Sequence, residues 1–363
     1  MKLSTILFLL LFTFQIPAQI KLIEPIRESE PMTIHKARSL IGVQSFRNWG
    51  IEKLELQNIM NTQKGAGIRV CICDTGRPNH NDLNGNISES KNFTSDADDF
   101  DEYGHSTHVA GIVHEIAPEA RLYFAKVLDH NGSGTSPGVA AGIDWCIFRK
   151  ANIINLSLGS PSPSAVIKKA IQDATMFDIV VVAAAGNDGQ SETENKMGYP
   201  ARYNETIAIG SINDLLNTSY FSSSGDEGDV MAPGEKILST WLNGNYIVLS
   251  GTSMATPFVS GVAALYLEKY GTIAGLEKVF ETSATDMNPA GFDRYSFWGF
   301  VTPQRIFEKD TVETPPQDTI IEEPIPDPGD PLPFPSGWQW VFVGGAVIGI
   351  FILVYFSWKK NKF

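Results

Sequence analysis

The sequence has few cysteines and little positive charge, and each shortage excludes a class of protein. Three cysteines cannot form the disulfide framework of a small secreted scaffold, and we expect Cys71, Cys73 and Cys146 as small buried apolar side chains. Without a second Cys/Cys or Cys/His pair at ligand spacing, a zinc site is not expected. The 28 Lys and Arg stand against 41 Asp and Glu, and this net charge of −13 disfavours a nucleic-acid partner.

The overall composition indicates a folded protein. Hydrophobic residues make up 43% and charged residues 19% of the 363 positions, which is too apolar for a disordered chain. The length suits one large domain or two ordinary ones.

The N-terminal end is hydrophobic. Lys2 precedes an apolar run from Leu3 to Ile16, and Pro17 and Ala18 follow it. This layout predicts a secretory signal peptide over residues 1–18. The alternative is an uncleaved N-terminal anchor, although the run is at the short end for crossing a bilayer.

The C-terminal end is hydrophobic as well. The run Trp340–Trp358 has 19 residues without a charge, about 28 Å of helix, so we predict a transmembrane helix over 338–358. Three lysines in the tail 359–363 favour a cytoplasmic end and argue against a cleaved lipid-anchor signal.

Residues 308–337 hold eight prolines and eight acidic residues, which predicts an extended stalk. The expected location is the cell membrane, single-pass, with the body periplasmic or extracellular.

Between residues 45 and 307, short apolar runs alternate with helical patterns. Continuous Val/Ile runs are typical of strands covered on both faces, and their alternation with helices indicates βαβ crossovers. We expect a three-layer α/β fold with a mostly parallel central sheet, in which residues just after the strands carry the chemistry. Strands are expected at Ile68–Cys73, Arg121–Val127, Ile153–Leu156, Ile179–Ala184, Thr206–Ile209 and Ile237–Thr240. Helices are expected near His105–His114, Gly138–Arg149, Ser164–Phe177 and Ser253–Tyr270.

Four short motifs stand where such a fold carries its chemistry. Asp74 begins the run DTG after one expected strand, and Asn187 lies in the run AGND after another. One expected helix opens in the run YGHSTHVAG around His105, and another opens in SGTSMATP around Ser253. In this order the motifs resemble those of the subtilisin-like serine peptidases, the subtilase family, over about Trp49 to Val301. The resemblance implies a subtilisin-like peptidase domain over 45–307, preceded by a short extension over 19–44.

The resemblance also implies the catalytic roles. An unassisted serine hydroxyl is a weak nucleophile at neutral pH, so a base oriented by a carboxylate has to take its proton. By resemblance, Ser253 is the nucleophile, His105 the base, Asp74 its orienting carboxylate and Asn187 the oxyanion donor; the chain order Asp, His, Ser is that of subtilisin. The implied function is a serine-type endopeptidase that acts through an acyl-enzyme. A single Asp, Asn or Ser at the end of a strand or the start of a helix is ordinarily a turn or cap residue. The four motifs together, in this order, favour catalytic roles.

A substrate groove follows from the same resemblance. In the family, a polypeptide substrate binds as an added strand between two edge segments. The residues implied for the groove and its first side-chain pocket are Gly132, Ser133, Gly134, Ser157, Leu158, Gly159, Ala184, Ala185, Gly186 and Gly198. Small residues there leave room for a large apolar side chain before the cut, while Asp188 at the rim could admit a basic one.

Departures from the family pattern keep a second function open, a catalytically silent subtilase-fold binding module. Ser106 stands where the family usually has glycine, next to the expected base. Between the signal peptide and Trp49 there is no room for a folded inhibitory prodomain. The residues around Pro25 to Pro31 are either trimmed or wrap around the body.

The remaining expectations concern metals and partners. The stretch from His114 to Pro118 is too short for the family's loop with a tight calcium site, so we expect no required cofactor and no metal ligands. A weak Ca²⁺ site near Tyr199 and Asp214 stays open. The expected partners are a polypeptide substrate and the membrane, with no nucleic acid, and the oligomeric state is open.

Overall fold

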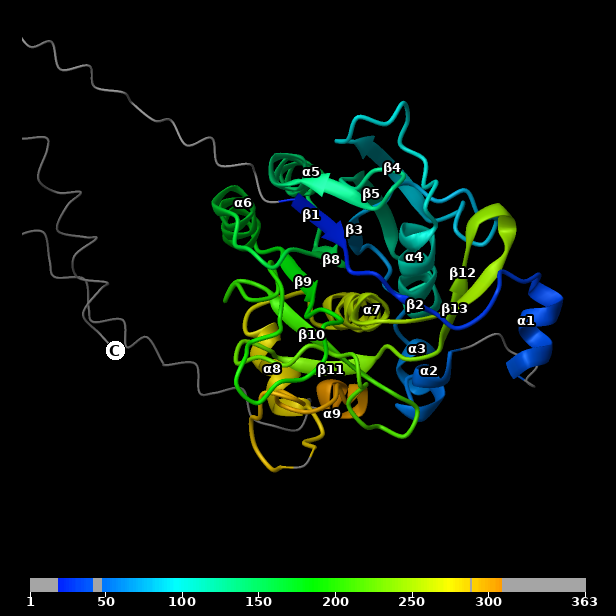
Figure 1. The fold of residues 1–363 in the computed structure, drawn as a ribbon. Coiled ribbons are helices and arrows are strands. Elements are labelled where there is room, and N and C mark those ends of the chain that lie inside the picture. The colour runs from blue at the N-terminus through cyan, green and yellow to red at the C-terminus, as the bar shows by residue number, and fades with distance from the viewer. Residues whose placement is uncertain (1–18, 42–47, 288, 309–363) are drawn as a thin grey trace, which may run out of the picture. The chain divides into compact units, whose positions relative to one another are not determined.

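The computed structural model describes residues 19–41, 48–287 and 289–308 (Figure 1). All of these belong to one compact unit that covers residues 1–312, and a second unit covers residues 313–363. The expected signal peptide, membrane helix and tail lie outside the described residues, as does the expected stalk beyond Glu308. Among the described helices, none combines the length and the apolar character that crossing a bilayer requires.

A parallel sheet runs through the body (Figure 1). Within the described residues it has seven strands in the order β11-β10-β9-β7-β3-β5-β4, and each neighbouring pair is parallel. The strand β9, with the sequence VVVAA, is buried along its whole length, as expected where helices cover both faces. The strands are β3 (Arg69–Asp74), β4 (Ile87–Asn92), β5 (Arg121–Lys126), β7 (Ile153–Leu156), β9 (Val180–Ala184), β10 (Ile207–Ile212) and β11 (Val230–Pro233).

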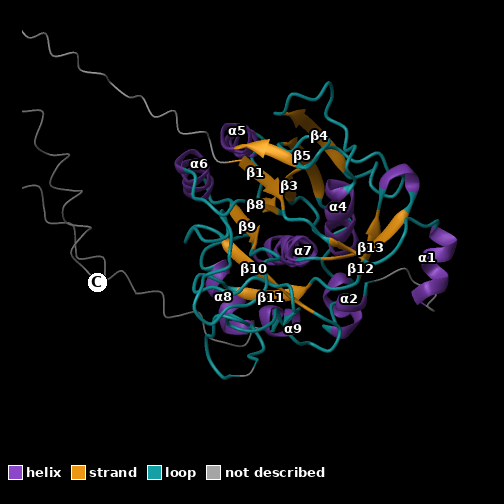
Figure 2. Ribbon diagram, in the orientation of Figure 1, coloured by secondary structure: helices purple, strands orange, loops and turns teal. Residues whose placement is uncertain are grey.

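Helices cover both faces of this sheet and complete three layers (Figure 2). Val70 and Ile72 of β3 belong to one hydrophobic core together with side chains of α4 and α7. Cys71 and Cys73, which point to the opposite face, belong to a second core with side chains of α5 and α6. The expected α/β class with a mostly parallel central sheet is confirmed. The bounds of these helices are α4 (His105–Ile116), α5 (Ser136–Phe148), α6 (Ala165–Met176) and α7 (Thr252–Tyr270).

Two strands of the central sheet were not expected from the sequence. The edge strand β4 reads ISESKN and is only partly buried, so it lacks the apolar run that marks an inner strand. The strand β11 at the other edge has only four residues and ends in Pro233. The predicted strand Ile237–Thr240 forms as β12, but it lies in a separate antiparallel sheet with β13 (Tyr246–Ser250) and β2 (Ile26–Arg27).

Smaller elements complete the described body. A third sheet has the order β6-β1-β8, with β1 in the middle. Its strands and the remaining helices are β1 (Gln19–Leu22), β6 (Ser133–Thr135), β8 (Leu158–Gly159), α1 (Ile34–Ile41), α2 (Trp49–Lys53), α3 (Gln57–Met60), α8 (Leu276–Ser283), α9 (Pro303–Phe307) and the short 3₁₀ helix Leu242–Gly244.

Two of the three cysteines form a disulfide, which was not expected from the sequence. All three are buried, but Cys71 of β3 forms a disulfide with Cys146 of α5, their Cα atoms 5.9 Å apart. The sequence pattern shows that Cys71 and Cys73 share a strand face, but it does not show that α5 brings Cys146 onto that face. Cys73 is a free thiol whose Sγ lies 3.5 Å from Sγ of Cys146.

Candidate active site

Asp74 and His105 form a buried pair at the carboxyl end of the central sheet. Asp74 ends β3 and His105 begins α4, and neither side chain is exposed to solvent. Nδ1 of His105 lies 2.9 and 3.0 Å from the two carboxylate oxygens of Asp74. This contact fixes the ring so that Nε2 points away from the carboxylate. In the described part of the structure, Nε2 has no hydrogen-bond partner.

A second carboxylate, Asp101, holds the first turn of α4. Its Oδ1 accepts hydrogen bonds from the hydroxyl of Thr75 and the N–H of Gly104, both at 2.8 Å. Its Oδ2 accepts from both the N–H and the hydroxyl of Thr107. Burial raises the pKa of this carboxyl. Asp101 therefore ties the residue after Asp74 to the helix that carries His105.

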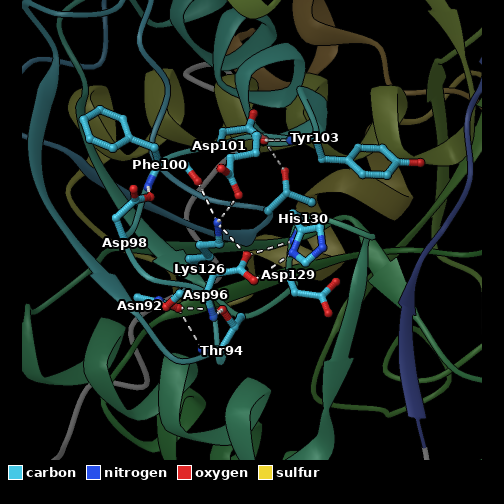
Figure 3. Close-up of polar contacts among 12 residues, drawn as sticks. Asn92, Thr94, Asp96, Asp98, Phe100, Asp101, Tyr103, Lys126, Asp129 and His130 are labelled. Carbon is cyan, nitrogen blue, oxygen red and sulfur yellow. Dashed lines mark hydrogen bonds and ion pairs between the residues drawn. The ribbon is translucent and has the colours of Figure 1, made fainter.

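Lys126 fixes the loop that leads to His105 (Figure 3). It is paired with Asp74 in the register between β3 and β5, and its side chain is fully buried. Its ammonium donates to the carbonyl oxygen of Phe100 at 2.7 Å and lies 2.9 Å from a carboxylate oxygen of Asp96. Because an ammonium inside the protein must be paired, this contact anchors the loop.

His108, one turn beyond His105, has a structural role. Its Nε2 lies 3.2 Å from the carbonyl oxygens of Ile237 and Ile247. Burial and the neighbouring His105 lower the pKa of His108 to about 3. The imidazole is therefore neutral at working pH and donates to the small antiparallel sheet.

Ser253 is the second residue of α7 and is fully buried. Its Oγ lies 3.1 Å from the carbonyl oxygen of Ile23 and 3.3 Å from that of Ser157. A hydroxyl has one proton to donate, and both of these partners are main-chain acceptors. In this state the hydroxyl is therefore directed at the main chain rather than at Nε2 of His105.

Asn187 follows β9 and faces the start of α7. Its Oδ1 accepts from the N–H and the hydroxyl of Thr252, each at 3.0 Å, which fixes the orientation of the amide. Its Nδ2 donates to the carbonyl oxygen of Glu24 at 2.9 Å. The structure thus brings Asp74 next to His105, and it brings Ser253 and Asn187 to adjacent carbonyls of one segment.

That segment is the chain's own N-terminal extension, which lies in the expected substrate groove. The strand β1 pairs antiparallel with β6 on one side and β8 on the other (Figure 1). Ile20 pairs with Gly134, Lys21 with Gly159, and the N–H of Leu22 donates to the carbonyl oxygen of Gly132 at 2.8 Å. The two expected edge segments are therefore bridged by a strand.

The extension continues past Ser253 on the other side. Pro25 lies against Gly251: a Cβ added to Gly251 would lie 3.5 Å from Cα of Pro25. Beyond it, β2 pairs with β13, and Glu28 accepts a hydrogen bond from the hydroxyl of Ser250 at 2.6 Å. Of the two outcomes left open for this region, wrapping around the body is the one that the structure shows.

A cavity lies beside the extension and shares part of the lining expected for the first side-chain pocket. This cavity of about 760 Å³ is lined by residues that include Ile23, Gly159, Gly186, Asp188 and Gly198. Three of the expected pocket residues do not line it: Leu158, Ala184 and Ala185. These three are buried, and Leu158 and Ala185 pack into the core shared with α5 and α6.

The sequence alone does not indicate that the groove is occupied. The alternation that would have revealed it is short: Ile20 and Leu22 are buried in β1, while Gln19 and Lys21 are exposed. Four residues of alternation are a weak strand signal beside a predicted signal peptide. Only the contacts with β6 and β8 show what this strand pairs with.

A buried Asp–His pair at the end of a sheet and a serine in the first turn of a helix are both features of serine hydrolases. A profile described as the subtilase family matches residues 65–299, so the chain belongs to that family. It is 42% identical to subtilisin DY of Bacillus licheniformis over 236 residues, which are 62% of this chain and 85% of that protein. It is 40% identical to an intracellular serine protease of Paenibacillus polymyxa over 232 residues, 60% of this chain and 71% of that protein. It is 43% identical to subtilisin E of Bacillus subtilis over 220 residues, 57% of each chain. The protein is thus a subtilisin-like serine endopeptidase.

Proposed function

We propose that Ser253, His105, Asp74 and Asn187 hydrolyse peptide bonds through an acyl-enzyme. In the reaction, Oγ of Ser253 attacks the carbonyl carbon of the substrate while its proton passes to Nε2 of His105. Asp74, on Nδ1, stabilises the imidazolium that results. Nδ2 of Asn187 and the N–H of Ser253 would hold the oxyanion. His105 then protonates the leaving amine, and water, activated by the same imidazole, releases the acyl group.

The observation that carries this proposal is the strand β1 in the groove. An extended polypeptide pairs there with both edge segments and brings the carbonyl of Ile23 to 3.1 Å from Oγ of Ser253. Main-chain pairing of this kind selects extended segments of a protein over folded ones. Unfolded or extended polypeptides are therefore the proposed substrates, with an aliphatic side chain such as that of Ile23 before the cut.

We also propose that the bound extension keeps the enzyme latent. Ser253 contacts the carbonyl of Ile23, whereas Asn187 donates to the next carbonyl, that of Glu24. Attack needs one carbonyl to meet both groups, since the oxyanion forms on the carbonyl that is attacked. The hydroxyl is also turned away from His105. The extension thus occupies the groove without the alignment that hydrolysis needs.

Casein hydrolysis by the full chain tests the proposed chemistry. We expect the full chain with Leu22→Asp, which places a charge at a buried position of β1 and frees the groove, to cleave casein. Adding Ser253→Ala to that chain should lower the activity by about 10³-fold or more. Ser260→Ala is a matched control, because this buried serine lies on the same helix and bonds to Asn155 instead of the groove. If Ser253→Ala retains the activity, the assignment is wrong. If no folded form cleaves any polypeptide, the silent binding module becomes the better interpretation.

The membrane-tethered form is proposed on sequence grounds. The uncharged run Trp340–Trp358, followed by lysines, supports a single span with the body periplasmic or extracellular. We expect the full chain to stay in the membrane pellet after carbonate extraction and a variant ending before residue 338 to leave it. Full extraction of the intact chain would contradict the proposal.

A further inference from the structure

Tyr103 contacts the extension beside the nucleophile. Its hydroxyl lies 2.7 and 3.0 Å from the two carboxylate oxygens of Glu24. Figure 3 shows the ring of Tyr103 directed away from the cluster around Lys126, so the loop that Lys126 anchors holds this side chain out toward the groove. Burial and the adjacent Glu24 carboxylate raise the pKa of Tyr103, so the phenol keeps the proton that it donates.

Glu24 lies next to the residue that contacts the nucleophile. Ser253 contacts the carbonyl of Ile23, whereas Asn187 contacts that of Glu24. We take the register from the nucleophile, which makes Glu24 the residue directly after the bond at Ser253. The ring of Tyr103 lies beside Gly132, where an added Cβ would come within 3.3 Å of it, and Gly132 bonds to Leu22. The ring of Tyr103 thus borders the groove near Leu22, before the bond at Ser253, and its hydroxyl reaches the side chain of Glu24, after that bond.

The carboxylate of Glu24 has few other partners. Within the described residues, no basic side chain forms an ion pair with it, and its side chain is exposed. Arg27, three residues further, lies over the ring of Trp241 instead. The phenol is therefore the group that holds the carboxylate.

We infer that Tyr103 is a specificity residue that favours an acidic side chain directly after the cleaved bond. The inference rests on the proposed function and names a substrate feature of the same site. A phenol donating to a carboxylate makes a charge-assisted hydrogen bond, which is stronger than one to a neutral amide. A basic side chain at that position offers no acceptor to the phenol.

Matched peptides test the inference. The substrates are IKLIXSI peptides with X as Glu, Gln, Ala or Lys, and the enzymes are full chains carrying Leu22→Asp to free the groove, with or without Tyr103→Phe. With Tyr103 present, we expect kcat/KM for the Glu peptide to exceed that for the Gln peptide by about 3- to 10-fold. In Tyr103→Phe that ratio falls to about one, because the Glu peptide loses a charge-assisted hydrogen bond and the Gln peptide only a weaker neutral one.

Other outcomes overturn the inference. A preference for Glu that survives Tyr103→Phe assigns the selection to another group, and equal rates for Glu and Gln with Tyr103 present remove the selection altogether. The expected cleavage lies between Ile and X. If mass spectrometry finds cleavage after X instead, the register taken from Ile23 is wrong. If none of the peptides is cleaved, both the proposed function and the inference are wrong. If the peptides are cleaved without selectivity, only the inference is wrong.

The intact extension offers an independent check. Glu24→Gln and Tyr103→Phe should each accelerate labelling of Ser253 by a fluorophosphonate in the otherwise wild-type chain, by about 3- to 10-fold. Because Glu24→Gln weakens the contact that Tyr103→Phe removes, the double variant should be no faster than Tyr103→Phe alone. Additive effects would show that Tyr103 and Glu24 act separately.

Discussion

The extension should leave the groove when Leu22 is replaced by aspartate. Leu22 is 4% exposed and packs into the core shared with α5 and α6. Burying a leucine contributes about 1.5–3 kcal/mol, and Leu22→Asp loses this while forcing a carboxylate into an apolar site. At 1.4 kcal/mol per tenfold, the open groove should become about 10- to 100-fold more populated.

The assay is the initial rate at which the full chain hydrolyses a fluorogenic peptide. Leu22→Asp should raise that rate by about 10- to 100-fold, up to the ceiling set by a fully open groove. Lys21→Asp is the control, because it adds the same side chain at an exposed position of β1 and should change the rate by no more than about twofold. Should Leu22→Asp fail to fold, Leu22→Ala gives a smaller increase in the same direction. Equal rates for the folded variants and wild type would refute latency.

Three further predictions follow from the site and the core. Asp74→Asn should lower kcat by about 10⁴-fold with the fold intact, as measured in the full chain with Leu22→Asp, since the amide no longer stabilises an imidazolium. Cys146→Ala should lower the free energy of unfolding in urea by about 2–5 kcal/mol, because it opens a loop with a sequence separation of 75 residues, and Cys73→Ala should cost less. His108 has a folded pKa of about 3, below its unfolded value, so its contribution to stability is complete above pH 6.5 and falls by up to about 1.4 kcal/mol per unit as the pH drops toward 3. Urea unfolding of wild type and His108→Gln between pH 7 and 4.5 should show a shallower loss for the variant.

The inner strands and the main helices could be predicted because their sequence carries a strong pattern. The run VVVAA of β9 and the helix opened by Ser253 are long and apolar, and parallel topology leaves few ways to arrange them. Asp74 ends β3, His105 begins α4 and Asn187 follows β9, so the positions of these residues depend little on loop details.

The features that could not be predicted depend on contacts between distant parts of the chain. The edge strand β4 is polar, and its pairing with β5 cannot be read from its own residues. The bond between Cys71 and Cys146 needs the packing of α5 on β3. The strand β1 carries too few residues for a pattern, and its two partners, β6 and β8, lie far along the chain from it. Ser106, which raised the possibility of a silent fold, donates its N–H to the hydroxyl of Thr75 and leaves the Asp74–His105 pair intact.

The most direct test of the account is to label the full chain and its Leu22→Asp variant with a fluorophosphonate and to identify the modified residue by mass spectrometry. We expect label on Ser253 in both proteins, with faster labelling in Leu22→Asp, and no label on α7 in Ser253→Ala. A folded Leu22→Asp protein that takes no label, or that carries it on another serine, would contradict the central claim that Ser253 is the activated nucleophile of a groove covered by the chain's own N-terminal strand.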